Sequence, residues 1–149
     1  MKKYVALILL LALTLCGCTK PDETQSEGVA MDMLEIKEKM FVAQVTDIYT
    51  NAADYLGQKL KYEGLFTIET LEATGAIYHM VIRYGPGCCD IDGVVGFEVK
   101  YDKPFPKQND WVEVSGTLIE YEENGTMYLC VQADEIKVLE QRGLETVTQ

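Results

Sequence analysis

The amino-acid sequence predicts an all-β fold, and three observations support this prediction. Residues 56–69 and 108–121 share one pattern, which is a polar turn, an alternating strand, a glycine and more strand. Apolar and polar residues alternate along both segments, as is typical of half-buried strands. Further short alternating segments follow, separated by turn residues, at 76–84, 94–101, 126–132 and 136–139.

The two glycines inside the long alternating segments, Gly64 and Gly116, indicate how the sheet is shaped. A glycine within a strand weakens it and usually marks a bulge or a sharp bend. Long strands that bend in the middle allow one sheet to curl and close on itself. Five or six strands, two of them bent, therefore favour a small OB-like Greek-key barrel over a sandwich.

Helical structure is expected only near the start of the domain. Residues 41–49, FVAQVTDIY, are ambiguous between an opening strand and a short helix. Residues 51–56 predict a helical turn that Gly57 ends, because glycine tolerates the backbone conformation at a helix terminus. The predicted fold is thus a barrel with one short helical segment.

A hairpin is predicted around Asn124-Gly125, which is the strongest two-residue turn signal for a type I′ turn. The resulting register pairs Tyr121 with Tyr128, Ile119 with Cys130, and Leu118 with Val131. In that register Leu118, Leu129 and Val131 face the core, and Cys130 lies on the opposite, mixed face.

The chain opens with MKKYVALILLLALTLCGCTK. Its apolar run, residues 4–16, is too short for a spanning helix, which needs roughly 20 residues. The run suits the apolar core of a secretory signal. The following LCGC resembles the lipobox of bacterial lipoproteins. We therefore expect lipidation of Cys18 rather than of Cys16, because a bulky Leu15 would precede the latter.

This interpretation divides the chain into four parts. A signal peptide spans 1–17, a polar disordered tether spans 18–34, one β-barrel domain spans 35–140, and a tail spans 141–149. Two lipid chains on Cys18 would anchor the domain stably at the extracytoplasmic face of the cell membrane. The alternative is an ordinary cleaved signal and a released protein.

The formal net charge of the chain is −11, and loss of Lys2 and Lys3 with the signal takes the mature part to −13. Such a surface is repelled by nucleic-acid phosphates and by anionic lipid headgroups. The composition therefore excludes nucleic acid as a partner.

Three cysteines remain in the mature domain besides the lipidation site, namely Cys88, Cys89 and Cys130. One reading is a disulfide between Cys130 and one of the adjacent pair, since disulfides form in exported proteins. A bridge between Cys88 and Cys89 themselves would be strained, because adjacent Cα atoms are closer than a disulfide prefers. A third reading is an inert, reduced pair.

The remaining reading is a metal or redox site. Three thiolates with His79, the one histidine of the chain, would form a Cys₃His set suited to tetrahedral zinc. The competing reading of His79 is an ordinary strand residue. Asp90 and Asp92 alternate like the start of a calcium loop but lack its other ligands. The bend Gly85-Pro86-Gly87 precedes the two cysteines and would present them at a fixed angle.

Several of these residues carry a family resemblance. Arg83, Cys88-Cys89 and Asp92 at their spacing, followed by the strand that runs from Trp111 to Gly116, resemble an uncharacterised bacterial OB-like domain family. The upstream YLGQKLKYEGLF is also similar to that family, and the match covers residues 41–139. The family forms the soluble C-terminal part of a membrane protein paired with a predicted permease, and it also occurs in small lipoproteins. The resemblance implies a barrel fold and a role in transport or metal handling.

Together these observations predict a membrane-anchored, non-catalytic binding or accessory module whose partner is a membrane transport protein. Metal capture by Cys88 and Cys89, with His79 or Cys130, is its concrete form, and Arg83, Asp90 and Asp92 are candidate binding residues. The alternative is a module that binds a peptide, a glycan or a protein and has structural cysteines. Its binding face would carry Trp111, Tyr121 and Tyr128. An enzyme is not expected, because no serine or cysteine has a histidine and a carboxylate at a recognisable motif spacing.

Overall fold

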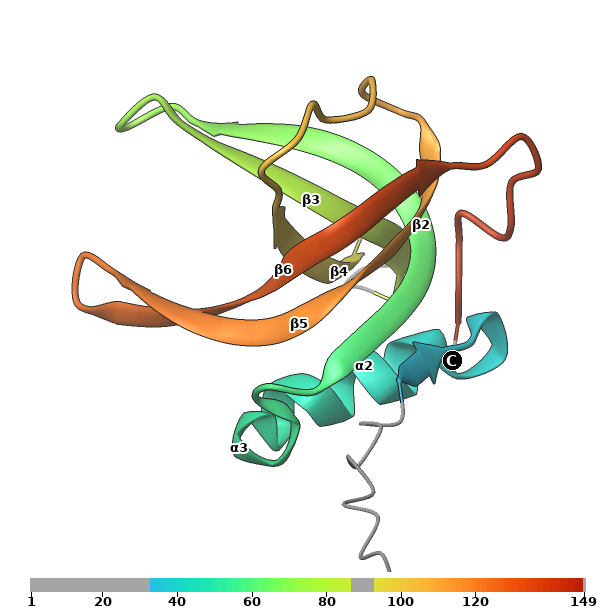
Figure 1. Ribbon diagram of the computed structural model, residues 1–149, viewed down its shortest axis with the longest axis horizontal. Coiled ribbons are helices and arrows are strands. Elements are labelled where there is room, and N and C mark those ends of the chain that lie inside the picture. The colour runs from blue at the N-terminus through green and yellow to red at the C-terminus, as the bar shows by residue number, and fades with distance from the viewer. Residues whose placement is uncertain (1–32, 87–92, 149) are drawn as a thin grey trace, which may run out of the picture. The chain divides into compact units, whose positions relative to one another are not determined.

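The computed structural model describes residues 33–86 and 93–148. Within them lie three short helical elements and six strands (Figure 1). The helical elements are η1 (Glu38–Met40), α2 (Phe41–Thr50) and α3 (Ala52–Tyr55). The strands are β1 (Leu34–Ile36), β2 (Lys59–Leu71), β3 (Ala76–Gly85), β4 (Gly93–Lys100), β5 (Trp111–Glu123) and β6 (Thr126–Val138).

Five of the described strands close into a barrel. The sheet order is β1-β2-β3-β4-β6-β5, and an additional pairing of β2 with β5 joins the two ends. The barrel neighbours are antiparallel except β4 and β6, which run parallel. β1 adds outside the ring as a parallel partner of β2. The predicted fold class, a small all-β barrel with a short helical segment, is confirmed.

The two glycine-containing strands bend, as the sequence predicts. β2 pairs with β5 over residues 59–65 and with β3 over residues 65–71, so it changes partners beside Gly64. In β5 the register against β6 shifts between Ser115 and Gly116, which is a β-bulge. These two features allow a single sheet to close. The segments predicted as separate strands at 126–132 and 136–139 are instead one continuous strand, β6, opposite the bulge.

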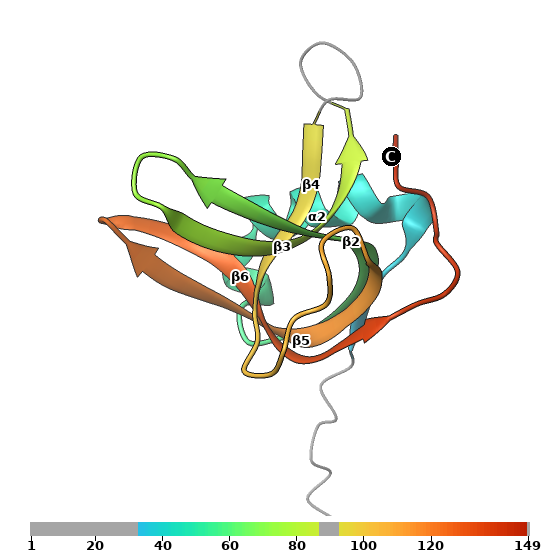
Figure 2. The same ribbon diagram turned by 90° about the horizontal axis from the view of Figure 1, so that it is seen from above.

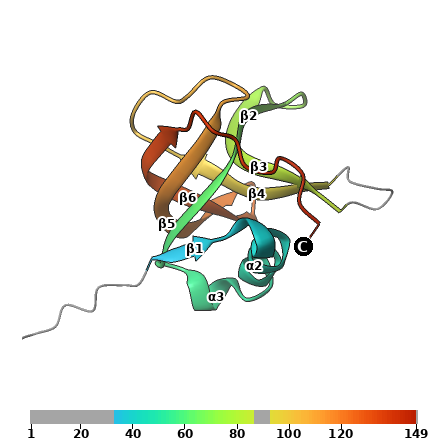
Figure 3. The same cartoon turned by 90° about the vertical axis from the view of Figure 1, so that its right-hand side faces the viewer.

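Residues 41–49 form a helix, which resolves the ambiguity of that segment. Phe41, Val45 and Ile48 recur every three or four residues, and each is at most 2% exposed. They belong to the same buried cluster as Phe66 and Phe97 of the strands, so α2 closes one end of the barrel (Figure 3). The predicted helical turn at 51–56 is α3, and Gly57 ends it with φ of +83°.

The predicted hairpin between β5 and β6 is confirmed. Asn124 and Gly125 have φ of 52° and 80°, as a type I′ turn requires. Tyr121 pairs with Tyr128, Ile119 with Cys130, and Leu118 with Val131. Leu118 and Val131 are fully buried, and Leu129 is partly buried.

The compact unit extends beyond the predicted domain limits of 35–140. β1 begins at Leu34, within the predicted tether. At the other end, the segment predicted as a tail packs on the barrel. The Tyr84 amide donates to the Glu145 carbonyl, the Val147 amide donates to the Tyr84 carbonyl, and Val147 is 4% exposed. Hydrogen bonds to the β3 backbone thus make residues 144–147 part of the folded unit. The predicted signal peptide and most of the predicted tether lie outside the described residues.

Candidate functional site

The β2–β3 and β5–β6 hairpins project from the same side of the barrel (Figures 1 and 2). Side chains of both hairpins line a groove, here called the hairpin groove. Its volume is about 330 Å³. The β2–β3 hairpin, the β5–β6 hairpin, β4 and α2 all contribute side chains to it. The lining residues are Tyr49, Leu71, Tyr78, Met80, Glu98, Tyr121, Glu123, Tyr128 and Leu129.

Tyrosine hydroxyls and two carboxylates organise this groove. Tyr78 donates to Glu123 over 2.8 Å, which links the two hairpins, and Tyr121 donates to Glu98 of β4. The Tyr121 and Tyr128 rings stack with centroids 5.8 Å apart. Rings and aliphatic side chains therefore form the walls, and the two carboxylates supply the charge.

Three phenols of the groove, those of Tyr49, Tyr78 and Tyr121, stay protonated over the physiological pH range. The hydrogen bond to Glu123 raises the pKa of Tyr78. Burial, followed by the hydrogen bond to Glu98, raises the pKa of Tyr121. Burial raises the pKa of Tyr49 to about 12, and its hydroxyl donates to the Gly96 carbonyl over 3.0 Å. All three hydroxyls thus act as hydrogen-bond donors, which fixes the rings in place.

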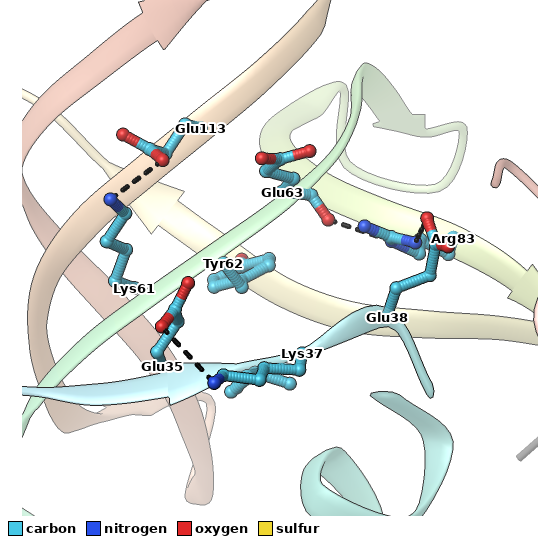
Figure 4. A pocket seen from close by; sticks show the side chains of 9 residues that line it. Glu35, Lys37, Glu38, Lys61, Tyr62, Glu63, Arg83 and Glu113 are labelled. Atoms are coloured by element: carbon cyan, nitrogen blue, oxygen red, sulfur yellow. Dashed lines mark hydrogen bonds and ion pairs between the residues drawn. The ribbon is translucent and has the colours of Figure 1, made fainter. Parts of the chain in front are cut away.

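A second depression, here called the polar cleft, has a volume of about 270 Å³ and lies over β1, β2 and β5 (Figure 4). Its charged side chains are paired with one another. Lys61 lies 2.9 Å from Glu113, Lys37 lies 3.9 Å from Glu35, and Arg83 lies 3.1 Å from Glu38. The Glu63 carboxylate accepts a hydrogen bond from the Trp111 indole over 3.2 Å. A charged ligand would have to displace these internal partners, so the polar cleft is the weaker candidate.

Arg83, which the sequence suggested as a binding residue, is a buried structural residue. It is 2% exposed. Its guanidinium donates to the Glu63 carbonyl, the Glu38 carboxylate and the Leu144 carbonyl over 2.9–3.1 Å. It also lies 4.8 Å from the Phe41 ring centroid and 5.0 Å from that of Trp111. The side chain therefore ties η1, β2 and the C-terminal segment together.

The structure separates the three residues of the predicted aromatic face, Trp111, Tyr121 and Tyr128. Tyr121 and Tyr128 do lie together in the hairpin groove. Trp111 is 1% exposed and packs with Leu65 and Ile82 at the opposite end of β5. Because Trp111 is buried and lies at the other end of β5 from Tyr121, it is not part of the predicted binding face.

The metal set that combines His79 with Cys130 is not compatible with the sheet. Met80 pairs with Glu98 and Glu98 with Cys130, so these three lie on one face. His79, the neighbour of Met80, points to the other face, where its ring stacks on Phe105 with centroids 3.8 Å apart. The described residues contain no group of three or more potential ligands that could hold a metal. His79 is thus an ordinary strand residue in an aromatic stack.

Cys130 is a free thiol buried between β4 and β5, although the sequence placed it on a mixed face. Burial raises the pKa of the thiol, so it stays protonated. The structure therefore gives no support to a disulfide at this position. Four other predicted site residues and the lipidation site lie outside the described residues, namely Cys88, Cys89, Asp90, Asp92 and Cys18.

Sequence reasoning missed Tyr49, Tyr78, Glu98 and Glu123. Glu123 could have been found, because it shares a strand face with Tyr121 at a spacing of two residues. Glu98 could not have been found in this way. It joins the groove through the parallel pairing of β4 with β6, and no turn motif in the sequence indicates that pairing. Tyr49 enters from a helix whose placement depends on the closed barrel.

Glu38 gives a testable pH dependence. The Leu144 amide donates to its carboxylate over 2.8 Å and, with Arg83, lowers its pKa below the usual 4.5. A lowered pKa in the folded state stabilises the fold above the unfolded-state pKa, and this contribution is lost as the pH falls. Because the side chain is 39% exposed, we expect Glu38→Gln to destabilise by at most about 1 kcal/mol at pH 7 and less at pH 3. Urea unfolding at both pH values measures this difference, and exposed Glu72→Gln is the control.

The described residues thus form a small all-β barrel with an aromatic groove on one side and a charge-paired cleft on another. The chain belongs to the family of the DUF1980 C-terminal domain, which matches residues 18–144. This is an uncharacterised bacterial domain family, so membership assigns no activity. Among the described residues, no helix has the length and apolar character needed to cross a membrane.

Other comparisons add little. A solved structure of a DUF3299 family protein from Pseudomonas aeruginosa PAO1 is 20% identical to this chain, with a TM-score of 0.39. The alignment covers 60% of this chain and 66% of that protein. No curated protein matches the chain.

Proposed function

We propose that this chain is a non-catalytic binding module, held by a lipid anchor at the extracytoplasmic face of a bacterial membrane, and that the hairpin groove is its ligand-binding surface. One observation carries the proposal. Two hairpins and β4 enclose about 330 Å³ lined by four tyrosines, three aliphatic side chains and two carboxylates. Ligand sites are typically concave and mostly apolar, with a few convergent polar groups that fix orientation.

The strand order supports an OB-like interpretation of the barrel. In such barrels the ligand lies against the second and third strands, between the turns that follow the first and fourth strands. Counted from β2, these turns are residues 72–75 and 124–125, at the tips of the two hairpins that flank the groove. The argument is one of fold-level analogy and concerns the place of binding, not the ligand. The acidic chain disfavours the nucleic acids that many OB barrels bind.

Ligand binding at the groove is tested by titrating the full chain in mild detergent with a panel of short peptides and oligosaccharides, observed by backbone amide NMR shifts. We expect at least one probe to shift the amides around Tyr121 and Tyr128. Tyr128→Ala should weaken that binding about tenfold, because the exposed ring offers a stacking surface. Met127→Ala, at a neighbouring exposed residue on the other face of β6, should leave the binding unchanged. Shifts confined to other surfaces would contradict the proposal.

The anchor and the partner rest on the sequence. The apolar leader and the LCGC motif support lipidation of Cys18, and the family resemblance supports a membrane transport protein as the partner. Metabolic labelling with a palmitate analogue is expected to label the native chain and not Cys18→Ser. Equal labelling of both chains, or labelling of neither, would contradict the anchor.

Metal capture by Cys88 and Cys89 is a separate proposal, supported by two adjacent thiols after a Gly-Pro-Gly bend. Because the His79 ring is stacked on Phe105 and the Cys130 thiol is fully buried, the remaining candidate ligands are Asp90 and Asp92, which follow the pair in the sequence. We expect the reduced full chain to retain about one zinc per molecule after dialysis and the Cys88→Ser/Cys89→Ser variant to retain none. His79→Gln should bind zinc normally. Loss of zinc only in His79→Gln would overturn this ligand set.

A further inference from the structure

The hydrogen-bonding side chains of the hairpin groove specify a class of ligand, if the groove is the binding surface proposed above. Three of its four tyrosine hydroxyls already donate hydrogen bonds to acceptors of the chain, and these belong to Tyr49, Tyr78 and Tyr121. The carboxylates of Glu98 and Glu123 each accept one of these bonds, although a carboxylate has about four acceptor positions. The side chains of the groove therefore offer a ligand many acceptors, and within the described part of the chain the one tyrosine hydroxyl still free to donate is that of Tyr128.

The charge of the groove is partly balanced at its base. Lys100 is two residues from Glu98 on β4, so both side chains leave the same face of the strand. The Lys100 Nζ lies 3.1 Å from the centroid of the Tyr121 ring, and the hydroxyl of that ring bonds Glu98. One of the two negative charges thus has a cation nearby, and no lysine or arginine is among the described lining residues to attract an anion. These contacts favour a neutral ligand that brings its own hydrogen-bond donors.

Two tyrosine rings of the groove offer an open face to such a ligand. The Tyr49 ring stacks on Phe97 with centroids 5.2 Å apart, and the Tyr128 ring stacks on Tyr121. Each ring is thus supported from one side, and exposed fractions of 48% for Tyr49 and 45% for Tyr128 leave ring surface for a ligand. The face of an aromatic ring is electronegative, so it attracts C–H groups that carry a slight positive charge. Sugar rings carry such C–H groups on their faces.

We propose that the hairpin groove binds a neutral oligosaccharide. The sugar hydroxyls donate to the free acceptor positions of Glu98 and Glu123. The C–H faces of the sugar rings pack on Tyr49 and Tyr128.

A peptide segment fits the same groups less well. It brings a carbonyl acceptor with nearly every N–H donor, and the groove has few side-chain donors left for these carbonyls. A sugar hydroxyl is both donor and acceptor, so it can bond a carboxylate and still accept a bond from water or from a neighbouring hydroxyl. The hydrogen-bonding groups therefore favour the sugar.

The test uses the full chain in mild detergent, with binding measured by calorimetry and by amide NMR shifts. The neutral probes are cellohexaose, maltohexaose and the hexamer of N-acetylglucosamine. The charged probes are the anionic hexagalacturonate and the cationic hexamer of glucosamine. We expect at least one neutral probe to bind and to shift the amides around Glu98 and Tyr128, with less than about a twofold change in affinity between about 50 and about 500 mM salt. Hexagalacturonate should not bind.

Matched variants test the two kinds of contact. Glu123→Gln should weaken binding of the neutral probe about tenfold, because an amide keeps only part of the acceptor capacity and loses the charge. Glu122→Gln makes the same charge change one residue away, on the other face of β5 at an exposed position, and should bind like the native chain. Tyr128→Phe keeps the ring and should retain binding, whereas Tyr128→Leu keeps an apolar side chain without a ring and should weaken it about tenfold.

The two proposals fail differently. If a short peptide shifts the groove amides and none of the three neutral hexasaccharides does, the groove is a binding surface and the sugar inference is wrong. Binding of the glucosamine hexamer alone, equal weakening by Glu122→Gln and Glu123→Gln, or native binding by Tyr128→Leu would also overturn the sugar inference. If no probe shifts the groove amides, both proposals are wrong.

Discussion

Replacing Arg83 by methionine is expected to lower the free energy of unfolding by about 3–5 kcal/mol. Methionine keeps most of the aliphatic stem but removes the guanidinium. The Glu63 and Leu144 carbonyls then lose a charged donor in a site where Arg83 is only 2% exposed. The contacts with the Phe41 and Trp111 rings are lost as well. Urea unfolding followed by the fluorescence of Trp111, the one tryptophan, measures the effect.

Two further variants sharpen this prediction. Arg83→Lys should recover only part of the stability, because an ammonium group cannot reproduce the planar fork that reaches three acceptors. Arg142→Met removes the other arginine that contacts the C-terminal segment. The Arg142 guanidinium bonds the Glu145 carboxylate and the Asn109 carbonyl, but its side chain is 48% exposed. It should cost no more than about 1 kcal/mol. Equal destabilisation by Arg83→Met and Arg142→Met would show that Arg83 is not the buried tie between these segments.

Arg83 also shows where sequence reasoning stops. A charged residue beside two cysteines suggests a binding site, and the residues that bury it are distant in sequence. Glu38 and Leu144 are 45 and 61 positions away. No local pattern links them, since the contact forms only when β3 pairs with β2 and the C-terminal segment returns to the barrel. The same return explains why the sequence predicts a tail at residues 141–149, although Val147 is buried.

The strands and the hairpin register could be predicted because their causes are local. Alternation along residues 108–121 identifies the core face of β5, and Asn124-Gly125 identifies the turn that pairs Tyr121 with Tyr128. Only the half of the hairpin groove that the β5–β6 hairpin supplies could be predicted from the sequence. The other half comes from β2, β3, β4 and α2, which meet the β5–β6 hairpin only because the sheet closes.

Replacing Gly96 by alanine is expected to destabilise the barrel by at least about 3 kcal/mol, because two independent costs coincide at this residue. Gly96 has φ of 153°, which side chains rarely adopt. A Cβ added there would lie 2.2 Å from the Val81 carbonyl oxygen and 2.8 Å from the Ile82 Cα, both backbone atoms of β3. The β3–β4 pairing must therefore shift, and Tyr49 of the hairpin groove would lose its acceptor, the Gly96 carbonyl.

Two other glycines separate these costs. Gly125→Ala adds only backbone strain, since φ is +80° and no atom lies within 4 Å of the added Cβ, so about 1 kcal/mol is expected. Gly116→Ala adds only a clash, at 2.3 Å from the Gln132 carbonyl oxygen, and about 1–3 kcal/mol is expected. Urea unfolding of the three variants should rank Gly96→Ala as the least stable. If Gly96→Ala unfolds like Gly125→Ala, the close approach of β3 and β4 does not limit this barrel, and the position of Tyr49 in the groove does not depend on it.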